Sequence, residues 1–313
     1  MRKLGVVMDP ISKIKIAYDT TFALMLEAQA RDWEIYYLEA QDIWLQEGIV
    51  WGRMQQLELK DDPNSWFEVQ QELVQPLSEM NCILMRKDPP FNMEYIYLTY
   101  LLEQVEAHDV LVINRPSSLR DANEKLFTTW FPQCCPKTLV SSDREVILEF
   151  VEDNENCIIK PLDSMGGNSI FKLERRDPNL NSIIDLVTHK AHRHVMVQEF
   201  LPDISKGDKR IFLVNGEASL AFARIPAIDD FRGNLSAGAH AEIIELSERD
   251  HWIIEQLNPV LKDKGLIFVG IDIIGDYLTE INVTSPGCAR EIEAASDFNA
   301  CAKLFDYIEN ELQ

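Results

Sequence analysis

Residues 266–293 read LIFVGIDIIGDYLTEINVTSPGCAREIE and contain two apolar runs with a short break between them. The runs are Leu266–Ile274 and Tyr277–Val283, and the break is Gly275-Asp276. Two apolar runs joined by a glycine and an aspartate are typical of a β-hairpin. Because the flanking sequence is almost continuously apolar, we predict that the hairpin is buried in the core of the protein.

Three polar residues interrupt the predicted hairpin: Asp272, Glu280 and Asn282. Glu280 and Asn282 are two residues apart, so in a strand their side chains lie on the same face. Carboxylate and carboxamide oxygens suit a hard cation such as Mg²⁺, which takes few protein ligands and keeps positions for phosphate oxygens. The alternative is a solvated strand face, which agrees poorly with the apolar surroundings. We therefore predict a metal site.

The metal site requires a particular hairpin register. A simple two-residue loop at Gly275-Asp276 would place Asp272 opposite Thr279 and Glu280 on the other face. A three-residue loop or a β-bulge would place Asp272 and Glu280 on one face. The metal interpretation therefore depends on the second geometry.

Composition limits the classes of protein to which this chain can belong. It has 313 residues, enough for two or three packed units, and 46% hydrophobic residues, as in soluble globular proteins. A net charge of −22, from 30 basic and 52 acidic side chains, argues against a nucleic-acid partner and requires local cations for any anionic substrate. Six cysteines without a paired spacing predict reduced thiols in the cytoplasm, and we expect neither a signal peptide nor a membrane span.

The first third of the chain alternates apolar runs with helical spacing, which predicts a parallel α/β unit. Polar residues follow several of the predicted strands, where ligands of open α/β sheets gather: Asp9, Arg86, Lys87, Asp88 and Asn114. Ordinary loop polarity explains any one of them equally well. The expected strands are 3–8, 34–38, 82–86 and 110–114, the expected helices are 18–31 and 93–107, and an irregular hairpin is expected over 43–59.

Two lysines stand out in the middle of the chain. Asp121 or Asn123 is expected to cap a helix over 124–131, where Lys125 in the first turn opposes the helix dipole. Lys160 ends the predicted strand 157–161, and the loop after it contains Gly166-Gly167, which can approach a polyphosphate closely. A surface lysine and a plain hairpin turn are the alternatives. Strands are also expected over 170–173, 195–200, 211–214 and 218–224, and helices over 248–264, 289–295 and 299–312.

Pro226–His240 has no regular apolar period and contains Gly233, Gly238 and Arg232. A loop of this length in a compact domain is usually disordered or functional. We expect a lid that shields a reactive intermediate from water. A passive surface loop is the alternative.

Together these segments resemble bacterial glutathione synthetase, a family of ATP-grasp ligases. The resemblance rests on motifs that span nearly the whole chain: Met8-Asp9-Pro10, LMRKDPPF (84–91), SLRDANEKLF (118–127), IKPLDSMGGNSIF (159–171), Gly207–Arg210, Arg224–Leu235 and Lys264–Glu293. It implies an N-terminal α/β domain with a parallel sheet (residues 1–121), followed by the small (122–201) and C-terminal (202–313) parts of a two-part ATP-grasp fold of α+β type. It also implies ligation of γ-glutamylcysteine to glycine through an acyl phosphate, with ATP as co-substrate, and a homotetramer.

The resemblance also implies a role for individual residues. ATP would be bound by Lys125, Lys160, Gly166, Gly167, Gln198, Glu199, Phe200, Leu201 and Asp208. Two Mg²⁺ ions, which Mn²⁺ could replace, would be bound by Asp272, Glu280 and Asn282. The phosphoryl group or the dipeptide carboxylates would face Arg210, Arg224 and Arg232, and the peptide site would be lined by Arg86, Ser285 and Pro286.

Two positions depart from the family pattern: Ser164 replaces an expected glycine of the phosphate loop, and His240 lies near the end of the lid. Two other functions compete with the ligase. The first is an ATP-grasp ligase with a different acceptor, against which the peptide-site motifs RKDPP and TEINVTSP argue. The second is a nucleotide-binding module without turnover, against which Arg210 and the complete metal set argue.

Overall fold

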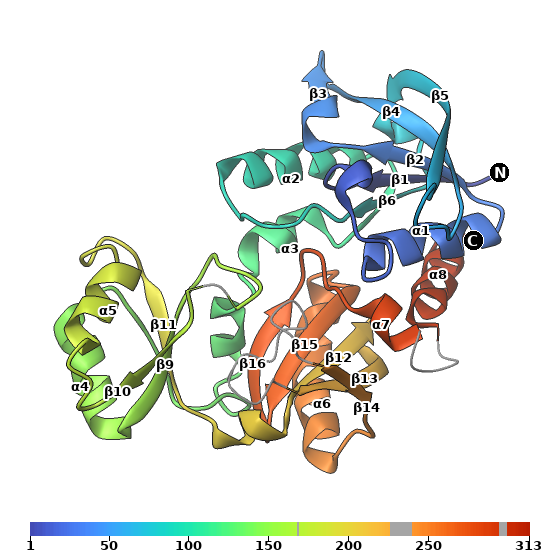
Figure 1. The fold of residues 1–313 in the computed structure, drawn as a ribbon. Helices are drawn as coiled ribbons and strands as arrows, with labels where there is room; N and C mark the ends of the chain where they lie inside the picture. The colour runs from blue at the N-terminus through green and yellow to red at the C-terminus, as the bar shows by residue number, and fades with distance from the viewer. Residues whose placement is uncertain (168, 226–239, 294–298) are drawn as a thin grey trace.

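Three β-sheets form the framework of the protein in the computed structural model, which describes residues 1–167, 169–225, 240–293 and 299–313 (Figure 1). A seven-stranded sheet uses the first third of the chain, a four-stranded sheet the middle, and a five-stranded sheet most of the remainder. The mixed α/β and α+β architecture predicted from the sequence is present. The domain limits 1–121, 122–201 and 202–313 stay a prediction.

The seven-stranded sheet is parallel at its centre and antiparallel at one side. Its parallel strands are β1 (Lys3–Val7), β2 (Glu34–Leu38), β6 (Cys82–Met85) and β7 (Leu111–Ile113). Strands β3 (Ile43–Gln46), β4 (Ile49–Leu59) and β5 (Phe67–Pro76) extend it in antiparallel fashion. Helices α1 (Thr20–Ala30), α2 (Met93–Glu106) and α3 (Pro116–Asp121) complete this part. The expected parallel unit is thus confirmed, with an antiparallel extension.

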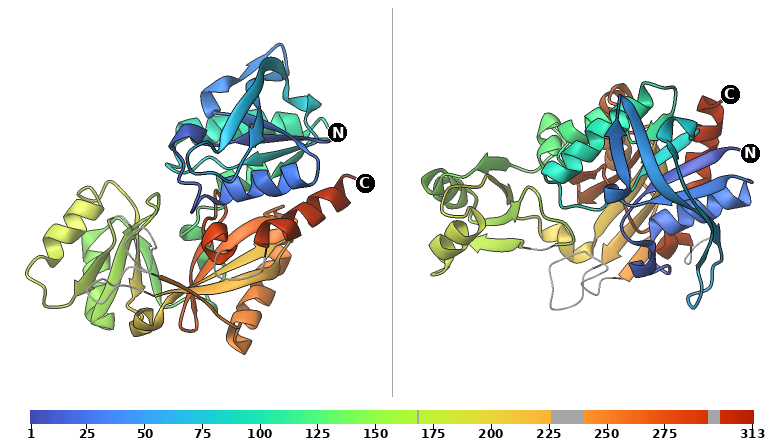
Figure 2. Two further views of the ribbon diagram at one scale, coloured as in Figure 1. Left: turned by 45° about the vertical axis from the view of Figure 1, so that its right-hand side comes forward. Right: turned by 90° about the horizontal axis from the view of Figure 1, so that it is seen from above.

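The four-stranded sheet belongs to a lobe of its own, set to one side of the molecule in both views of Figure 2. Its strands are β8 (Thr138–Ser141), β9 (Asn156–Pro161), β10 (Phe171–Glu174) and β11 (Val195–Glu199), all antiparallel. Helices α4 (Arg144–Asn154) and α5 (Leu180–Val187) pack against this sheet, and each buries its apolar face there.

The five-stranded sheet carries the hairpin predicted from the sequence. Its strands are β12 (Asp208–Val214), β13 (Glu217–Ile225), β14 (His240–Ile243), β15 (Phe268–Ile274) and β16 (Tyr277–Asn282). Helices α6 (Glu248–Asp263), α7 (Ala289–Glu293) and α8 (Ala300–Glu311) follow in this part of the chain. Helix α8 lies beside α1, which joins the C-terminal end to the N-terminal sheet (Figure 1).

The hairpin register decides the geometry of the metal face. The turn between β15 and β16 has two residues, because Ile274 pairs with Tyr277. A bulge follows at Thr279, since Ile273 pairs with Leu278 while Asp272 pairs with Glu280. A two-residue turn without a bulge would have separated the two carboxylates. The bulge places Asp272 opposite Glu280, and the second of the two predicted geometries is confirmed.

Asn114 ties the N-terminal sheet to the hairpin. It follows β7, is 4% exposed, and donates from Nδ2 to the carbonyls of Phe268 (2.8 Å) and Val283 (2.7 Å). Its Oδ1 accepts from the backbone N–H groups of Ile267 and Phe268, both at 2.8 Å. One amide side chain therefore satisfies four backbone groups at the base of the hairpin.

Three local predictions differ from the structure. Residues 116–121 form α3, for which the sequence predicts no helix, and α3 begins with proline at its first position. The helix expected over 124–131 is a short 3₁₀ helix, η4 (Leu126–Trp130), capped by Asn123 as one of the two candidates. Strand β5 was not predicted. In the described part of the chain, no helix is both long and apolar enough to cross a membrane.

Candidate active site

A cavity lies between the four-stranded and the five-stranded sheets, and we call it the central cavity. It contains every site residue predicted from the sequence except Arg86, Arg232, Ser285 and Pro286. Arg232 and the rest of the predicted lid before His240 lie outside the described residues. The central cavity is lined by Glu124, Lys125, Ile158, Lys160, Ser164, Met165, Gly166, Gly167, Ile170, Gln198, Glu199, Phe200, Leu201, Ile204, Asp208, Arg210, Arg224, Asp272, Ile274, Thr279, Glu280 and Asn282.

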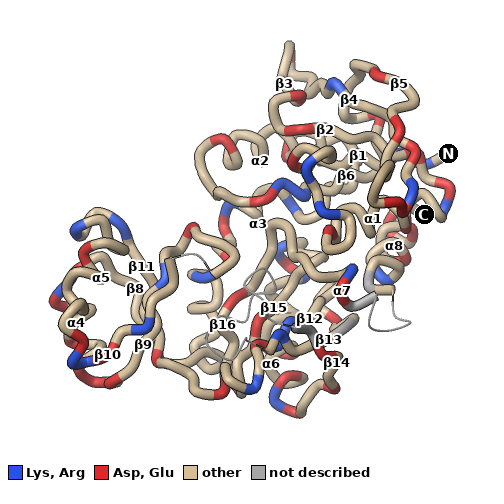
Figure 3. Tube along the Cα trace, viewed as in Figure 1, with Lys and Arg blue, Asp and Glu red and all other residues tan. Residues whose placement is uncertain are grey.

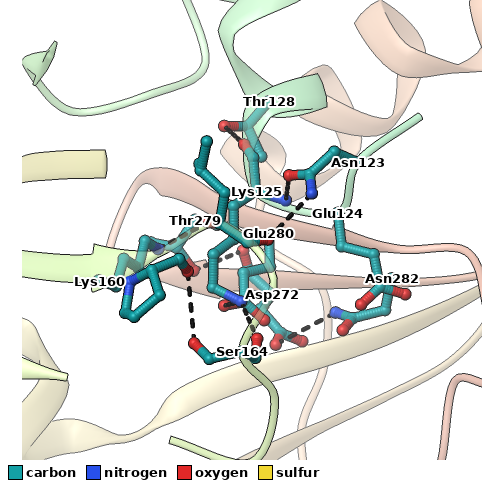
Figure 4. Close-up of polar contacts among 12 residues, drawn as sticks. Asn123, Glu124, Lys125, Thr128, Lys160, Ser164, Asp272, Thr279, Glu280 and Asn282 are labelled. Carbon is teal, nitrogen blue, oxygen red and sulfur yellow. Dashed lines mark hydrogen bonds and ion pairs between the residues drawn. The ribbon is translucent and has the colours of Figure 1, made fainter. Parts of the chain in front are cut away.

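Two buried lysines reach the central cavity from different elements (Figure 4). Lys160 lies at the end of strand β9, is 5% exposed, and donates from Nζ to the Thr279 carbonyl at 3.2 Å. Burial lowers its pKa, and the nearby Glu280 carboxylate opposes that effect. Lys125 precedes η4 and is 3% exposed, with its Nζ 3.3 Å from Glu280 Oε1. Both ammonium groups can therefore meet an anion in a site with little water to screen the charges.

Charged residues of alternating sign line one face of the five-stranded sheet. In the strand register Asp208 pairs with Arg224, and Arg210 pairs with Asp272, so all four side chains emerge on the same face. Asp272 accepts hydrogen bonds from Arg210 Nε and from Arg210 NH2 (2.9 Å), and Arg224 NH2 lies 2.9 Å from its Oδ2. Arg224 NH2 also contacts Asp208 Oδ2. Two arginines are thus shared between two carboxylates.

The uneven sharing separates the pKa values of the two acids. Burial acts to raise both, but Arg210 and Arg224 outweigh it at Asp272 and hold the pKa of that carboxyl well below its usual range. At Asp208 burial prevails over the single shared Arg224 and raises the pKa to about 7. In the Asp208–Arg224 ion pair, two buried atoms have no hydrogen-bond partner among the described residues: Asp208 Oδ1 and Arg224 Nε. They offer an acceptor and a donor to a bound molecule.

The predicted metal ligands lie together on this face. Asp272 and Glu280 are paired across the hairpin, and Asn282 follows two residues after Glu280 on the same face. Asn282 Nδ2 donates to the Gly270 carbonyl (3.2 Å) and lies 3.4 Å from Asp272 Oδ2, which leaves its amide oxygen as a donor atom for a cation. Within the described residues, no cluster of three or more His, Cys, Asp or Glu side chains is arranged to hold a metal. Two carboxylates and a carboxamide are oxygen donors of the kind that suits an ion such as Mg²⁺, which completes its coordination with phosphate oxygens.

The glycine loop between β9 and β10 forms one wall of the central cavity. Gly166 and Gly167 have φ values of 66° and 74°, which favour glycine because it lacks a Cβ. Asn123 Nδ2 donates to the Leu162 carbonyl at 2.9 Å, and Lys125 Nζ donates to the Ser164 carbonyl. The segment before η4 therefore holds the base of the loop, and Ser164 is accommodated through its backbone.

Arg86, Ser285 and Pro286 form a second cluster beside the central cavity. Arg86 is 6% exposed and donates from Nε to Thr21 Oγ1 (3.1 Å) and from NH2 to the Pro286 carbonyl (2.9 Å). Ser285 Oγ donates to Asp88. A Cβ built on Gly270 would lie 3.1 Å from Pro286 Cβ and 3.2 Å from Arg210 Cδ, so this cluster adjoins the charged face. The structure thus brings the three residues together at the junction of the N-terminal and C-terminal sheets.

Glu124 lines the central cavity, although the sequence did not indicate it as a site residue. It was expected in the first turn of a helix, where an acidic residue favours the helix dipole and needs no other explanation. The structure instead places it before a 3₁₀ helix, alongside β16. Its position next to Lys125 is the signal in the sequence that could have found it.

Comparisons with known proteins agree on one family. The model of the prokaryotic glutathione synthetase N-terminal domain matches residues 2–120, and that of the prokaryotic glutathione synthetase ATP-grasp domain matches residues 124–297. Glutathione synthetase of Vibrio vulnificus is 53% identical over 314 residues, covering 100% of this chain and 99% of its own. That of Coxiella burnetii is 52% identical over 308 residues, covering 98% of this chain and 96% of its own. The ATP-grasp ligase PsnB, solved with a minimal precursor, superposes with a TM-score of 0.68 at 20% identity over 100% of this chain and 99% of its own, which supports the fold.

Proposed function

The chain belongs to the prokaryotic glutathione synthetase family, and from this premise we propose how the residues of the central cavity perform its reaction. The function is ATP-dependent ligation of γ-glutamylcysteine to glycine through an acyl phosphate, giving glutathione, ADP and phosphate. One observation supports the assignment of roles most directly. The bulge at Thr279 sets two carboxylates opposite each other in a cavity that also contains two buried lysines and two buried arginines.

Lys125 and Lys160 bind the ATP phosphates in this proposal, and Gly166-Gly167 cover them. The ammonium groups are buried, so their attraction to phosphate oxygens is weakly screened. Asp208 Oδ1, which is buried and has no partner within the residues that the structure describes, accepts a hydrogen bond from a ribose hydroxyl. Adenine meets the segment 198–201. The N–H groups of Glu199 and Phe200 already donate to Lys137 and Asn156 carbonyls, so recognition uses other backbone groups of this segment.

Asp272, Glu280 and Asn282 hold Mg²⁺ with the nucleotide, and we propose two ions, with Mn²⁺ as a substitute. When bound, the metal neutralises charge on the phosphate oxygens during phosphoryl transfer. The oxygen donors of the three side chains fit such an ion. Arg210 and Arg224 hold the Asp272 carboxylate in place and keep it ionised, since they lower its pKa.

The dipeptide carboxylate attacks the γ-phosphorus of ATP, and the glycine amine then displaces phosphate from the acyl phosphate. Arg224 Nε, a buried donor with no partner in the described part of the chain, stabilises negative charge on the transferring group, with Arg210 beside it. We propose that Arg232, from outside the described residues, joins them. Arg86, Ser285 and Pro286 form the dipeptide site at the junction of the sheets, and Arg86 holds the Pro286 carbonyl at 2.9 Å.

Two further features belong to the same proposal. All six cysteines are free thiols, and five of them are buried, which suits a cytoplasmic enzyme. We also propose a homotetramer, as the family resemblance implies, and its mass in solution can be measured by light scattering.

The decisive experiment measures ADP and glutathione formation with γ-glutamylcysteine in the presence and absence of glycine. The proposed reaction predicts equal amounts of ADP and glutathione when glycine is present and slow ADP release when it is absent. Replacing the substrate glycine with free alanine in the assay tests which amino acid is the acceptor. ADP formation with another acceptor and none with glycine would assign the chain to a different ATP-grasp ligase.

A further inference from the structure

Glu124 makes an unusual set of contacts at the end of β16. Its Oε1 accepts hydrogen bonds from the backbone N–H groups of Val283 (2.9 Å) and Thr284 (3.0 Å) and from Thr284 Oγ1 (2.8 Å). Its backbone carbonyl accepts from the N–H of Ile281 at 2.9 Å. Glu124 therefore holds the segment 281–284 through both its main chain and its side chain.

Burial makes these contacts costly to lose. Val283 is fully buried and Thr284 is 7% exposed, so their N–H groups would be left without a partner if the carboxylate were removed. An unsatisfied buried donor costs more than the net gain of an ordinary hydrogen bond. Burial also raises the pKa of Glu124, and the hydrogen bonds from Thr284 oppose that effect. The Glu124 carboxylate is thus the acceptor that satisfies the buried N–H groups of Val283 and Thr284.

The position of Glu124 relates it to three parts of the reaction. Lys125, which we assign to the ATP phosphates, is the next residue in the chain. Asn282, which we assign to the metal, directly precedes Val283, and both Glu124 and Asn282 line the central cavity. Ser285 and Pro286, assigned to the dipeptide, directly follow Thr284. A carboxylate bonded between these groups fixes their relative positions.

We propose that Glu124 is a positioning residue that aligns the metal ligand Asn282 and the dipeptide loop 285–286 with the phosphate-binding Lys125. The inference rests on the proposed function. Glu124 acts through its acceptor oxygen, because Oε1 makes all three side-chain contacts. Misplacement of about 1 Å in such a site is enough to lower turnover strongly.

Three variants separate alignment from a merely structural role. Glu124→Ala removes the acceptor, Glu124→Gln keeps an oxygen of the same reach without the charge, and Thr284→Val removes only the hydroxyl contact. Glu255→Ala, at an exposed position of α6, is the matched control. Hydrogen exchange of the Val283 and Thr284 amides reports directly on the contact, and Mn²⁺ binding with a non-hydrolysable ATP analogue, followed by electron paramagnetic resonance, reports on the metal site without turnover.

We expect faster exchange at both amides in Glu124→Ala, an increase of about 10- to 100-fold in the KM for γ-glutamylcysteine, and weaker Mn²⁺ binding, measured well below the melting temperature. Glu124→Gln should keep the exchange protection of both amides and stay within about threefold of the parent enzyme in KM, since the glutamine amide oxygen can still accept their hydrogen bonds. Thr284→Val should lie between the two, and Glu255→Ala should match the parent.

Two outcomes would overturn the proposal. A lower melting temperature for Glu124→Ala with unchanged KM, kcat and Mn²⁺ binding would leave Glu124 a structural residue only. Equal damage in Glu124→Gln and Glu124→Ala would assign the effect to the charge instead of to the acceptor. If the parent enzyme made no glutathione, the proposed function would fail, whereas the exchange data would still decide whether Glu124 holds residues 283–284.

Discussion

Asp272 and Glu280 face each other across the hairpin, yet we expect Asp272→Asn and Glu280→Gln to differ sharply in their effect on stability. Both variants keep the size of the side chain and remove a carboxylate that we assign to Mg²⁺. The Asp272 side chain is only 5% exposed and compensates two buried arginines, Arg210 and Arg224. The Glu280 side chain is 22% exposed, and the ion pair that it forms among the described residues is with Lys125 at 3.3 Å.

The contacts allow the size of each effect to be worked out. Removing one partner of a buried ion pair costs about 3–5 kcal/mol, because the remaining charge is left uncompensated. A partly exposed pair such as Glu280–Lys125 contributes about 0–1 kcal/mol. For an unfolding unit of about 150–250 residues, 1 kcal/mol corresponds to about 2–4 °C in melting temperature. Asp272→Asn should therefore lower the melting temperature by about 6–20 °C and Glu280→Gln by at most about 4 °C.

Two assays on the same samples test this expectation. Thermal unfolding followed by circular dichroism gives the melting temperatures, and Mn²⁺ titration in the presence of a non-hydrolysable ATP analogue gives the metal affinity. Both variants should bind Mn²⁺ at least about tenfold more weakly and lose nearly all ligation, because each removes a charged oxygen donor. Asp276→Asn, at an exposed position in the turn of the same hairpin, should behave like the parent enzyme.

A compensating variant makes the test stricter. Asp272→Asn leaves Arg210 without its described carboxylate partner, whereas Arg224 keeps Asp208. Adding Arg210→Met therefore removes the cation that is left uncompensated and should restore part of the lost stability but none of the metal affinity. Equal melting temperatures for Asp272→Asn and Glu280→Gln would refute the reasoning from the arginines. Parent-like turnover of Glu280→Gln at low Mg²⁺ would refute the metal site itself.

Three further predictions follow from other contacts. Lys160→Met should weaken ATP binding by about tenfold or more. Its melting temperature should be unchanged or higher, because burial already lowers the pKa of this lysine. Unchanged nucleotide affinity together with a collapsed melting temperature in calorimetry would make Lys160 a structural residue. Arg86→Lys should raise the KM for γ-glutamylcysteine and leave the KM for ATP nearly unchanged, since lysine cannot donate hydrogen bonds to Thr21 and to the Pro286 carbonyl together. Equal effects on both KM values in steady-state assays would place Arg86 outside the dipeptide site. Asp208 has a pKa of about 7 in the folded protein against 3.8 as its ordinary value, so the folded state holds the proton more tightly and stability falls as pH rises between these values. The melting temperature of Asp208→Asn relative to the parent should therefore increase from pH 5 to pH 8, and a constant difference would contradict the raised pKa.

The sequence was sufficient to predict the hairpin, because glycine and aspartate between two apolar runs are a strong local signal. It left the register open, since a bulge at Thr279 depends on how β15 and β16 pair with their neighbours and not on the turn residues alone. Lys125 was predicted in the first turn of a helix, whereas the structure places it directly before the 3₁₀ helix η4. Its burial arises from Ser164 and Glu280, which are distant in sequence.

Other elements were missed for a related reason. Strand β5 has the sequence FEVQQELVQP, most of whose residues are exposed, so it has no apolar periodicity to detect. It exists because β4 offers it a long antiparallel partner. Glu124 was missed because a carboxylate at a predicted helix start is unremarkable, and only the tertiary structure brings Val283 and Thr284 to it. The partners of Glu124 are remote in the chain, whereas β5 depends on pairing with β4, the strand that directly precedes it.

The acidic composition makes the pairing of the buried cations significant. Acidic residues are distributed over all three sheets in Figure 3, so the overall field repels ATP and the dipeptide, and local cations have to attract them. Three of these cations face carboxylates: Lys125 faces Glu280, Arg210 faces Asp272, and Arg224 faces both Asp208 and Asp272. A magnesium nucleotide brings positive and negative charge together, so these groups can exchange partners without leaving a buried charge alone. Lys160 differs, since its described contact is the Thr279 carbonyl and no carboxylate of the described residues lies within ion-pair distance. It gains a full ionic partner when phosphate binds and gives up none, which makes Lys160 the cation whose removal should weaken ATP binding most.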